Sequence, residues 1–229
     1  MGNFTMFGIT RCGKMHRENQ DCIVHRTIAI GKPDTVFLLG VADGISGSAY
    51  GGSVARWLIE RHLAHIPLFD QPSPTVADQL ERALHDLSAA FRAEFADNET
   101  MLGSGAAFAV VAVHEGTAEC FWAGDVAIYL NRGTKKFAGS QITEPDLNRF
   151  RELTNWFGKT PFCPRHAAVS IVKGDVLTIA SDGANIDQFV LQEFYRKQGA
   201  GQSTLTAIAE LALRSPRADD VSLVAIAVE

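Results

Sequence analysis

Short apolar runs separated by polar turns recur along the chain, and this pattern is typical of a β-rich protein. Runs of Val, Ile, Leu, Phe and Thr that are bounded by Gly, Pro, Asp or Asn favour strands. Turns at 114–116 and 173–175 leave few residues between neighbouring runs, so we expect antiparallel hairpins at both places. The predicted strands are residues 21–30, 35–42, 105–114, 117–123, 126–131, 168–172, 175–180 and 221–228.

Other segments show apolar residues at helical spacing. Residues 75–98 carry one continuous stripe with steps of three and four, made of Val76, Leu80, Leu84, Leu87, Phe91 and Phe95. Further helices are predicted over 51–65, 144–154, 187–198 and 203–214. Several strands are apolar over most of their length, which indicates burial on both faces. Two antiparallel sheets packed on each other, with helices outside, would bury them in this way.

Composition narrows the function classes. The chain has 229 residues, 46% of them hydrophobic and 21% charged, with a net charge of -5. This charge and the lack of a Lys/Arg cluster argue against nucleic acid as a partner. The four cysteines form no C-x-x-C pair, so neither a zinc ribbon nor a thioredoxin-like motif is supported, and we expect reduced thiols in a cytoplasmic protein. No run of about 18 apolar residues predicts a membrane span.

The candidate chemistry lies in aspartates at the ends of apolar strands. Asp43 and Asp182 each follow such a run and precede a glycine, Asp125 follows FWAG, Asp219 precedes the last strand, and Asp21 opens an early one. A single Asp-Gly is usually only a turn. Five such positions together favour another interpretation, because converging carboxylates repel each other unless they are protonated or neutralised by cations. Carboxylate oxygens favour Mg²⁺, Mn²⁺ or Ca²⁺ over zinc.

The order of these segments resembles the PPM, or protein phosphatase 2C, family of metal-dependent phosphatases, in its bacterial form. The resemblance runs from about residue 9 to the C-terminus. It implies an α+β fold, a four-layer α-β-β-α sandwich, in one catalytic domain over 1–229 with a variable flap at 139–167. The matching segments are 13–21 (GKMHRENQD), 41–47 (VADGISG), 103–107 (GSGAA), 124–130 (GDVAIYL), 174–183 (GDVLTIASDG) and 219–222 (DDVS).

The resemblance also implies roles for the acidic residues. Asp43 would bridge two Mn²⁺ or Mg²⁺ ions, and the Gly44 carbonyl would bind one of them. Asp182 and Asp219 would complete the shell of the first ion. Asp21 would orient metal-bound water, and Asp125 would hold a possible third ion. The ions would activate a water for in-line attack on phosphorus.

This chain departs from the family pattern near the phosphate. The family arginine that grips the substrate phosphate falls on His16, with Arg17 next to it, so either side chain is a candidate for that contact. Gln20 replaces an acidic residue, and Val126 replaces a serine. The flap carries aromatic residues, among them Trp156, Phe157 and Phe162, which either meet a protein substrate or pack on the domain edge.

Three functions are compatible with these residues. The first is a phosphoserine/phosphothreonine phosphatase that acts, as a monomer off the membrane, on a protein phosphorylated by a Ser/Thr kinase. The second is a catalytically silent module that binds phosphoproteins, an alternative suggested by His16 and Gln20. The third is a phosphatase for small phosphorylated molecules. Retention of Asp43, Asp182 and Asp219 favours an active enzyme.

Overall fold

Two five-stranded antiparallel sheets form the centre of the protein. The computed structural model describes residues 3–29, 35–65, 75–133 and 139–229. One sheet has the order β1-β10-β9-β6-β7, with β1 (Phe4–Arg11), β10 (Val221–Val228), β9 (Val176–Ala180), β6 (Ala127–Asn131) and β7 (Gly139–Gln141). The other has the order β2-β3-β4-β5-β8, with β2 (Asp21–Ala29), β3 (Thr35–Gly44), β4 (Ala106–His114), β5 (Thr117–Ala123) and β8 (Arg165–Ser170).

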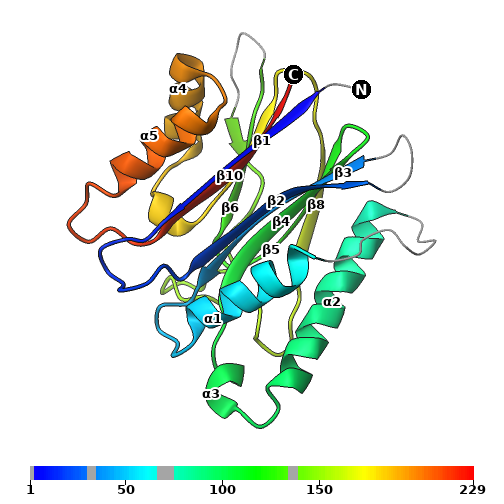
Figure 1. Ribbon diagram of the computed structural model, residues 1–229, viewed down its shortest axis with the longest axis vertical. Coiled ribbons are helices and arrows are strands. Elements are labelled where there is room, and N and C mark those ends of the chain that lie inside the picture. Colours follow the sequence, from blue (N-terminus) through cyan, green and yellow to red (C-terminus); the bar gives the residue numbers. More distant parts are fainter. Residues whose placement is uncertain (1–2, 30–34, 66–74, 134–138) are drawn as a thin grey trace.

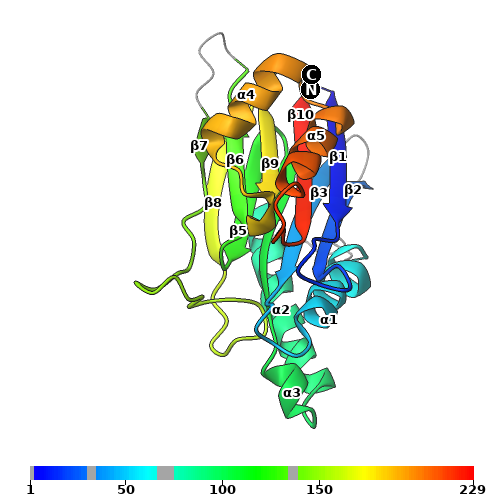
Figure 2. The same ribbon diagram turned by 90° about the vertical axis from the view of Figure 1, so that its left-hand side faces the viewer.

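Helices cover the outer face of each sheet, which confirms the predicted four-layer sandwich (Figures 1 and 2). The β2–β8 sheet is covered by α1 (Gly51–Arg56), its π-helical continuation η1 (Trp57–Leu63) and α2 (Val76–Glu94), and α3 (Glu99–Leu102) follows α2. The β1–β7 sheet is covered by α4 (Gln188–Gln198) and α5 (Gln202–Ala212). No helix in the described ranges is long and apolar enough to cross a bilayer.

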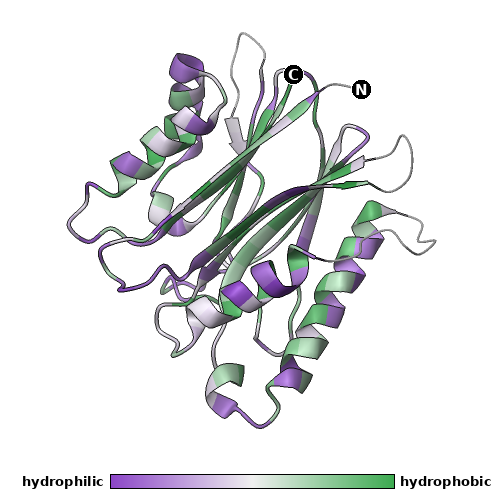
Figure 3. Cartoon of the chain, viewed as in Figure 1, coloured by the Kyte–Doolittle hydropathy of each residue, from purple (hydrophilic) through white to green (hydrophobic). Residues whose placement is uncertain are grey.

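Strand β4 shows why its sequence is apolar throughout. Its alternate residues Phe108 and Val110 pack in the cluster beneath α1 and α2, whereas Ala109 and Val111 pack in the cluster between the two sheets. All eight residues from Ala106 to Val113 are buried. Successive side chains of a strand point to opposite faces, so a strand in the middle of four layers needs apolar residues on both. Figure 3 shows the resulting hydrophobic interior and the more polar outer helix faces.

The sequence pattern predicts no strand over 4–11, yet these residues form the edge strand β1, paired with β10 from Phe4↔Val228 to Arg11↔Val221. Two other predictions of secondary structure are wrong. The turn at 173–175 links β8 to β9, which lie in different sheets, so it closes no hairpin. The turn at 114–116 does join the paired strands β4 and β5. The helix predicted over 144–154 is absent.

Local hydrogen bonds explain the missing helix at 144–154. The Asn148 side-chain oxygen accepts from the backbone N–H groups of Phe150 and Glu152, at 2.8 and 3.0 Å. Such side-chain bonds compete with helix formation. Arg151 has a φ of 64°, which a right-handed helix does not contain. The long predicted helix 75–98 also ends early, at Glu94, and Asn98 caps the separate helix α3 by accepting from Met101 N.

Two of the aromatic residues in the flap, Phe157 and Phe162, pack on the domain. Phe157 has no exposed surface and lies in the cluster beneath α1 and α2, with its ring 5.8 Å from Trp57 and 5.6 Å from Phe91. Phe162 packs against the same cluster. Both therefore stabilise the domain rather than face a substrate. Phe150 is different, because 68% of its surface is exposed.

Candidate active site

All five predicted aspartate positions lie at one end of the sandwich. In an antiparallel sheet, the start of one strand lies beside the end of its neighbour. Asp21 at the start of β2 is thus directly opposite Asp43 at the end of β3. In the other sheet the end of β9 lies beside the starts of β10 and β6, so Asp182, Asp219 and Asp125 are brought to the same end. Residues from five separate segments of the chain meet there.

The carboxylates interact electrostatically in a way that favours cations. Burial, followed by the charges of Asp21, Asp182 and Asp125, raises the pKa of Asp43 well above its ordinary value. Burial raises the pKa of Asp21 to about 7, and burial with the Asp182 charge raises that of Asp125 to about 6. Burial and the Asp219 charge raise the pKa of Asp182. Each shift records the free-energy cost of gathering negative charge in a partly dehydrated place.

Asp21 shows the same free-energy cost, because its carboxylate is buried and poorly hydrogen-bonded. The residue is 4% exposed, and among the described residues neither carboxylate oxygen makes a well-formed hydrogen bond, although the hydroxyl groups of Ser181 and Ser222 lie close enough to lower its pKa. A buried carboxylate without partners is expensive unless a cation or bound water compensates it. The donor set here consists of carboxylate and carbonyl oxygens, which are the ligands that Mg²⁺ and Mn²⁺ accept. The residues present therefore fit divalent metal ions.

Glycines let the backbone approach closely beside Asp43. A Cβ atom on Gly44 would lie 2.4 Å from the carbonyl carbon of Gly51, at the start of α1. A Cβ on Gly52 would lie 3.0 Å from the Cα of Gln20. The first turn of α1 is therefore in direct contact with both Gly44 and the residue before Asp21. Larger side chains would push these segments apart and move Gly44 and its carbonyl.

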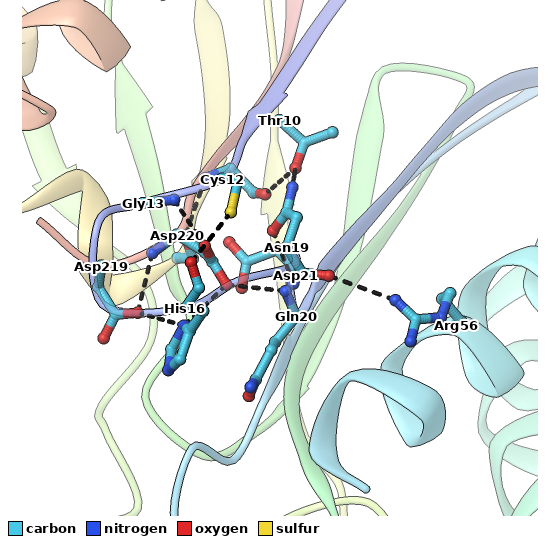
Figure 4. Close-up of polar contacts among 12 residues, drawn as sticks. Thr10, Cys12, Gly13, His16, Asn19, Gln20, Asp21, Arg56, Asp219 and Asp220 are labelled. Carbon is cyan, nitrogen blue, oxygen red and sulfur yellow. Dashed lines mark hydrogen bonds and ion pairs between the residues drawn. The ribbon is translucent and has the colours of Figure 1, made fainter.

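The loop 12–20, which links β1 to β2, is held by Asp220. The carboxylate of Asp220 is 3% exposed and accepts from Gly13 N and Gln20 N, both at 2.7 Å. The Ala218 carbonyl also accepts from Lys14 N and Met15 N, at 2.7 and 3.2 Å. Both ends of the loop are thus tied to the segment that carries Asp219 (Figure 4). Asp220 is a residue of this site that the sequence pattern does not single out. Its position directly beside Asp219 is the signal that could have marked it as part of the same site.

His16 faces the acidic residues. Its Nδ1 lies 3.1 Å from Asp220 Oδ2 and 3.3 Å from Asp219 Oδ1 (Figure 4). These contacts engage the Nδ1 side of the ring with carboxylates. Arg17, the other candidate for the phosphate, is exposed. Gln20 Oε1 is buried and has no hydrogen-bond partner among the described residues, so it is available as an acceptor.

A polar pocket of about 470 Å³ adjoins this end of the sandwich. One wall is the loop 12–20, and the other is formed by residues 49–56, which lead into α1 and make up this helix. Its lining residues are Met15, His16, Arg17, Glu18, Asn19, Gln20, Ala49, Tyr50, Gly51, Gly52, Ser53 and Arg56. Gln20 and Gly52 connect the pocket to the acidic cluster, because they contact each other and Gln20 precedes Asp21.

Comparison with known families decides what this arrangement belongs to. The family model for protein phosphatase 2C matches residues 12–214, which include the loop 12–20 and all of the acidic positions except Asp219. The chain belongs to the protein phosphatase 2C family. Among proteins with curated descriptions, none matches it by sequence.

Solved structures of bacterial phosphatases share the protein phosphatase 2C fold of this chain. The serine/threonine phosphatase PstP/Ppp of Mycobacterium tuberculosis has a TM-score of 0.82 at 19% identity, with 99% of each chain covered. PppA of Pseudomonas aeruginosa, described as a key regulatory component of T6SS, has a TM-score of 0.77 at 21% identity, with 99% of this chain and 98% of that one covered. Stp1 of Staphylococcus aureus has 0.79 at 16%, with 100% and 96% covered.

Another solved structure bears on the metals. The catalytic domain of PstP has been solved in complex with two manganese ions, and it matches this chain with a TM-score of 0.80 at 20% identity over 98% of each chain. Identities this low establish the common fold. The roles of individual residues in this chain depend on its own geometry.

Proposed function

We propose that this chain is a metal-dependent phosphatase that hydrolyses phosphoserine and phosphothreonine in proteins. The observation that carries the proposal is the convergence of Asp21, Asp43, Asp125, Asp182 and Asp219 at one end of the sandwich, with Asp21 and Asp43 directly opposite each other. Family membership supports it. A purely structural role would have no chemical reason to gather so many carboxylates that destabilise one another.

The proposal assigns two Mn²⁺ or Mg²⁺ ions to the acidic cluster. Asp43, Asp182 and Asp219 would hold the ions, and the Gly44 carbonyl would add a ligand. Asp125 is the residue available for a third. Bound ions would supply an activated water and offset the charge of the phosphoryl group.

The protein's own groups then position the reactants. Asp21 has two free acceptor oxygens and can orient water in the cluster. Arg17 lies on the exposed side of loop 12–20 and can donate to the substrate phosphate as a guanidinium. His16 already faces Asp219 and Asp220 through Nδ1, so the proposal gives it the task of holding the loop against these residues.

The test is hydrolysis of p-nitrophenyl phosphate and of phosphoserine and phosphothreonine peptides, with and without Mn²⁺ or Mg²⁺. Wild-type protein should require the metal. Asp43→Asn and Asp219→Asn should each lose several kcal/mol of transition-state stabilisation, on the order of a thousandfold in rate. Asp97→Asn, an exposed change far from these strand ends in sequence, serves as the matched control and should keep the rate.

The two alternatives predict other results. A folded protein with no turnover in either metal would overturn the proposal and leave the silent module. Rapid turnover of small phosphate esters without turnover of any phosphopeptide would indicate a small-molecule phosphatase.

A further inference from the structure

The pocket between loop 12–20 and α1 has a charge opposite to that of the acidic cluster beside it. Its lining carries two arginines, Arg17 and Arg56, against one glutamate, Glu18. The chain as a whole has a net charge of -5, so a positively charged hollow is not what its composition would produce on average. His16 also lines the pocket, but its Nδ1 faces Asp219 and Asp220. Arg17 is assigned to the substrate phosphate above, which leaves the guanidinium of Arg56 for a second anionic group of the substrate.

Arg56 is held in place rather than extended into solvent. It is the last residue of α1, is half-buried, and its Nη1 lies 3.3 Å from the carbonyl oxygen of Asn19 (Figure 4). This contact occupies one part of a group that carries five N–H donors, and within the described part of the chain no other acceptor is hydrogen-bonded to the group, so the remaining donors can bind a ligand. A preorganised guanidinium loses less conformational entropy on binding than a mobile one.

Loop 12–20, which forms the opposite wall of the pocket, is also held by hydrogen bonds. Asp220 holds loop 12–20 through Gly13 N and Gln20 N, and Ala218 holds Lys14 N and Met15 N. Arg17 thus projects from a loop whose two ends are anchored. Met15 and Tyr50 are 58% and 44% exposed and belong to opposite walls. Apolar surface at both walls of a polar pocket suits a peptide backbone that passes between them.

We infer that this pocket binds an acidic side chain of the phosphoprotein substrate, close in sequence to the phosphorylated residue. The inference rests on the proposed function and specifies its substrate. The pocket shares Gln20 with the wall of the acidic cluster, so the two sites are neighbours. An extended chain advances about 3.3 Å per residue, so an acidic residue one to three positions from the phosphorylated one could enter the pocket. Arg56 then determines which sequences are preferred.

The experiment compares three phosphopeptides that differ only in residues flanking the phosphorylated one, which are Glu, Gln or Lys. Wild-type protein should favour the Glu peptide over the Gln peptide by about fivefold in KM, the size expected for a partly exposed ion pair. Arg17→Gln should impair all three peptides alike, because it removes the proposed phosphate contact, whereas Arg56→Gln should abolish most of the preference. The loss for the Glu peptide should exceed the loss for p-nitrophenyl phosphate, which has no flanking residues.

Arg61→Gln is the matched control, because Arg61 lies in η1 next to α1 but pairs with Glu94 and does not line the pocket. It should keep the wild-type preference. Thermal melts check that each variant folds. Equal KM values for the three peptides with wild-type protein, or a preference that survives in the Arg56→Gln variant, would overturn the inference.

A binding measurement separates this inference from the proposed function. Fluorescence anisotropy with labelled Glu and Lys phosphopeptides reports the pocket without any turnover. Wild-type protein that hydrolyses nothing but prefers the Glu peptide, with loss of the preference in Arg56→Gln, would contradict the phosphatase proposal and support the pocket. Turnover of the phosphopeptides without a difference in their binding would support the phosphatase proposal and contradict the pocket inference.

Discussion

Buried aspartates lie at both ends of the sandwich, and their surroundings differ. Asp175, just before β9, is 1% exposed and fully paired, because it accepts from Arg132 Nη1 at 2.6 Å, Val172 N at 3.0 Å and Gly133 N at 3.2 Å. Asp21, at the other end, is 4% exposed, makes no well-formed hydrogen bond among the described residues, has only the hydroxyl groups of Ser181 and Ser222 nearby, and lies opposite another carboxylate. Burial alone therefore does not mark a functional aspartate.

The two aspartates differ in whether the protein itself supplies hydrogen-bond donors for the carboxylate. Asp175 is satisfied by the protein and closes the turns around it. Asp21 and its neighbours destabilise the chain until something positive joins them. A site that stores such unfavourable interactions is expected to bind what relieves them. The following predictions test this contrast.

The largest effect is expected at the structural end. Asp175→Ala should lower the free energy of unfolding by about 3 kcal/mol, because it leaves two backbone N–H groups and Arg132 without their buried acceptor. Urea unfolding measures the loss. The Mn²⁺-induced rise in melting temperature should stay as in wild type. A variant that keeps wild-type stability, or loses its response to Mn²⁺, would contradict the division of roles.

The next effect is a pH dependence without metal. The pKa of Asp21 is about 7 in the folded chain, against an ordinary 3.8, so the folded state holds a proton that the unfolded chain releases between these values. Asp21 alone should therefore lower stability as pH rises, by about 2 kcal/mol between pH 5.5 and 7.5. Denaturant titrations in chelator measure the slope. Asp43, Asp125 and Asp182 also have raised pKa values and add to it, so Asp21→Asn should reduce the slope but not abolish it, and an unchanged slope in that variant would exclude Asp21 as a contributor.

A smaller effect is expected from Asp43→Asn in metal-free protein at pH 8. Removal of one charge from the cluster should raise the free energy of unfolding by about 1.5 kcal/mol, since Asp21, Asp125 and Asp182 then repel fewer neighbours. The same variant should lose stabilisation by Mn²⁺. Asp97→Asn provides the baseline, with no change expected. Destabilisation by Asp43→Asn in chelator would mean that the carboxylate has a structural partner.

The smallest effect is expected at the anchor of loop 12–20. Asp220→Asn replaces one of the two acceptor oxygens by an NH2 group, which cannot accept a hydrogen bond. Either Gly13 N or Gln20 N then loses its acceptor, so the loop should loosen. Loss of one such bond should raise KM for phosphopeptides about fivefold. The Mn²⁺ concentration for half-maximal activity should not change. A drop in kcat with unchanged KM would instead place Asp220 among the metal-binding residues.

The sequence alone predicted much of this structure. Uniformly apolar strands such as β4 and the stripe of α2 report burial directly, because their periodicity reflects contacts on one or two faces. Strand β1 escaped detection, as its FTMFGITR sequence includes Gly8 and polar residues, and its place at the sheet edge is set by β10. The hairpin predicted at 173–175 failed because a short turn does not specify which sheet the next strand joins.

The amino-acid pattern is sufficient to identify the order of segments shared with the family and the aspartates at their ends. The folded structure is needed to show that Asp21 faces Asp43, that Asp220 anchors loop 12–20, that His16 faces Asp219 and Asp220, and that Arg56 lines the pocket beside them. These contacts join residues as many as 200 or more positions apart. Local patterns report how a segment is buried, but which segments meet depends on how the two sheets and their links are arranged.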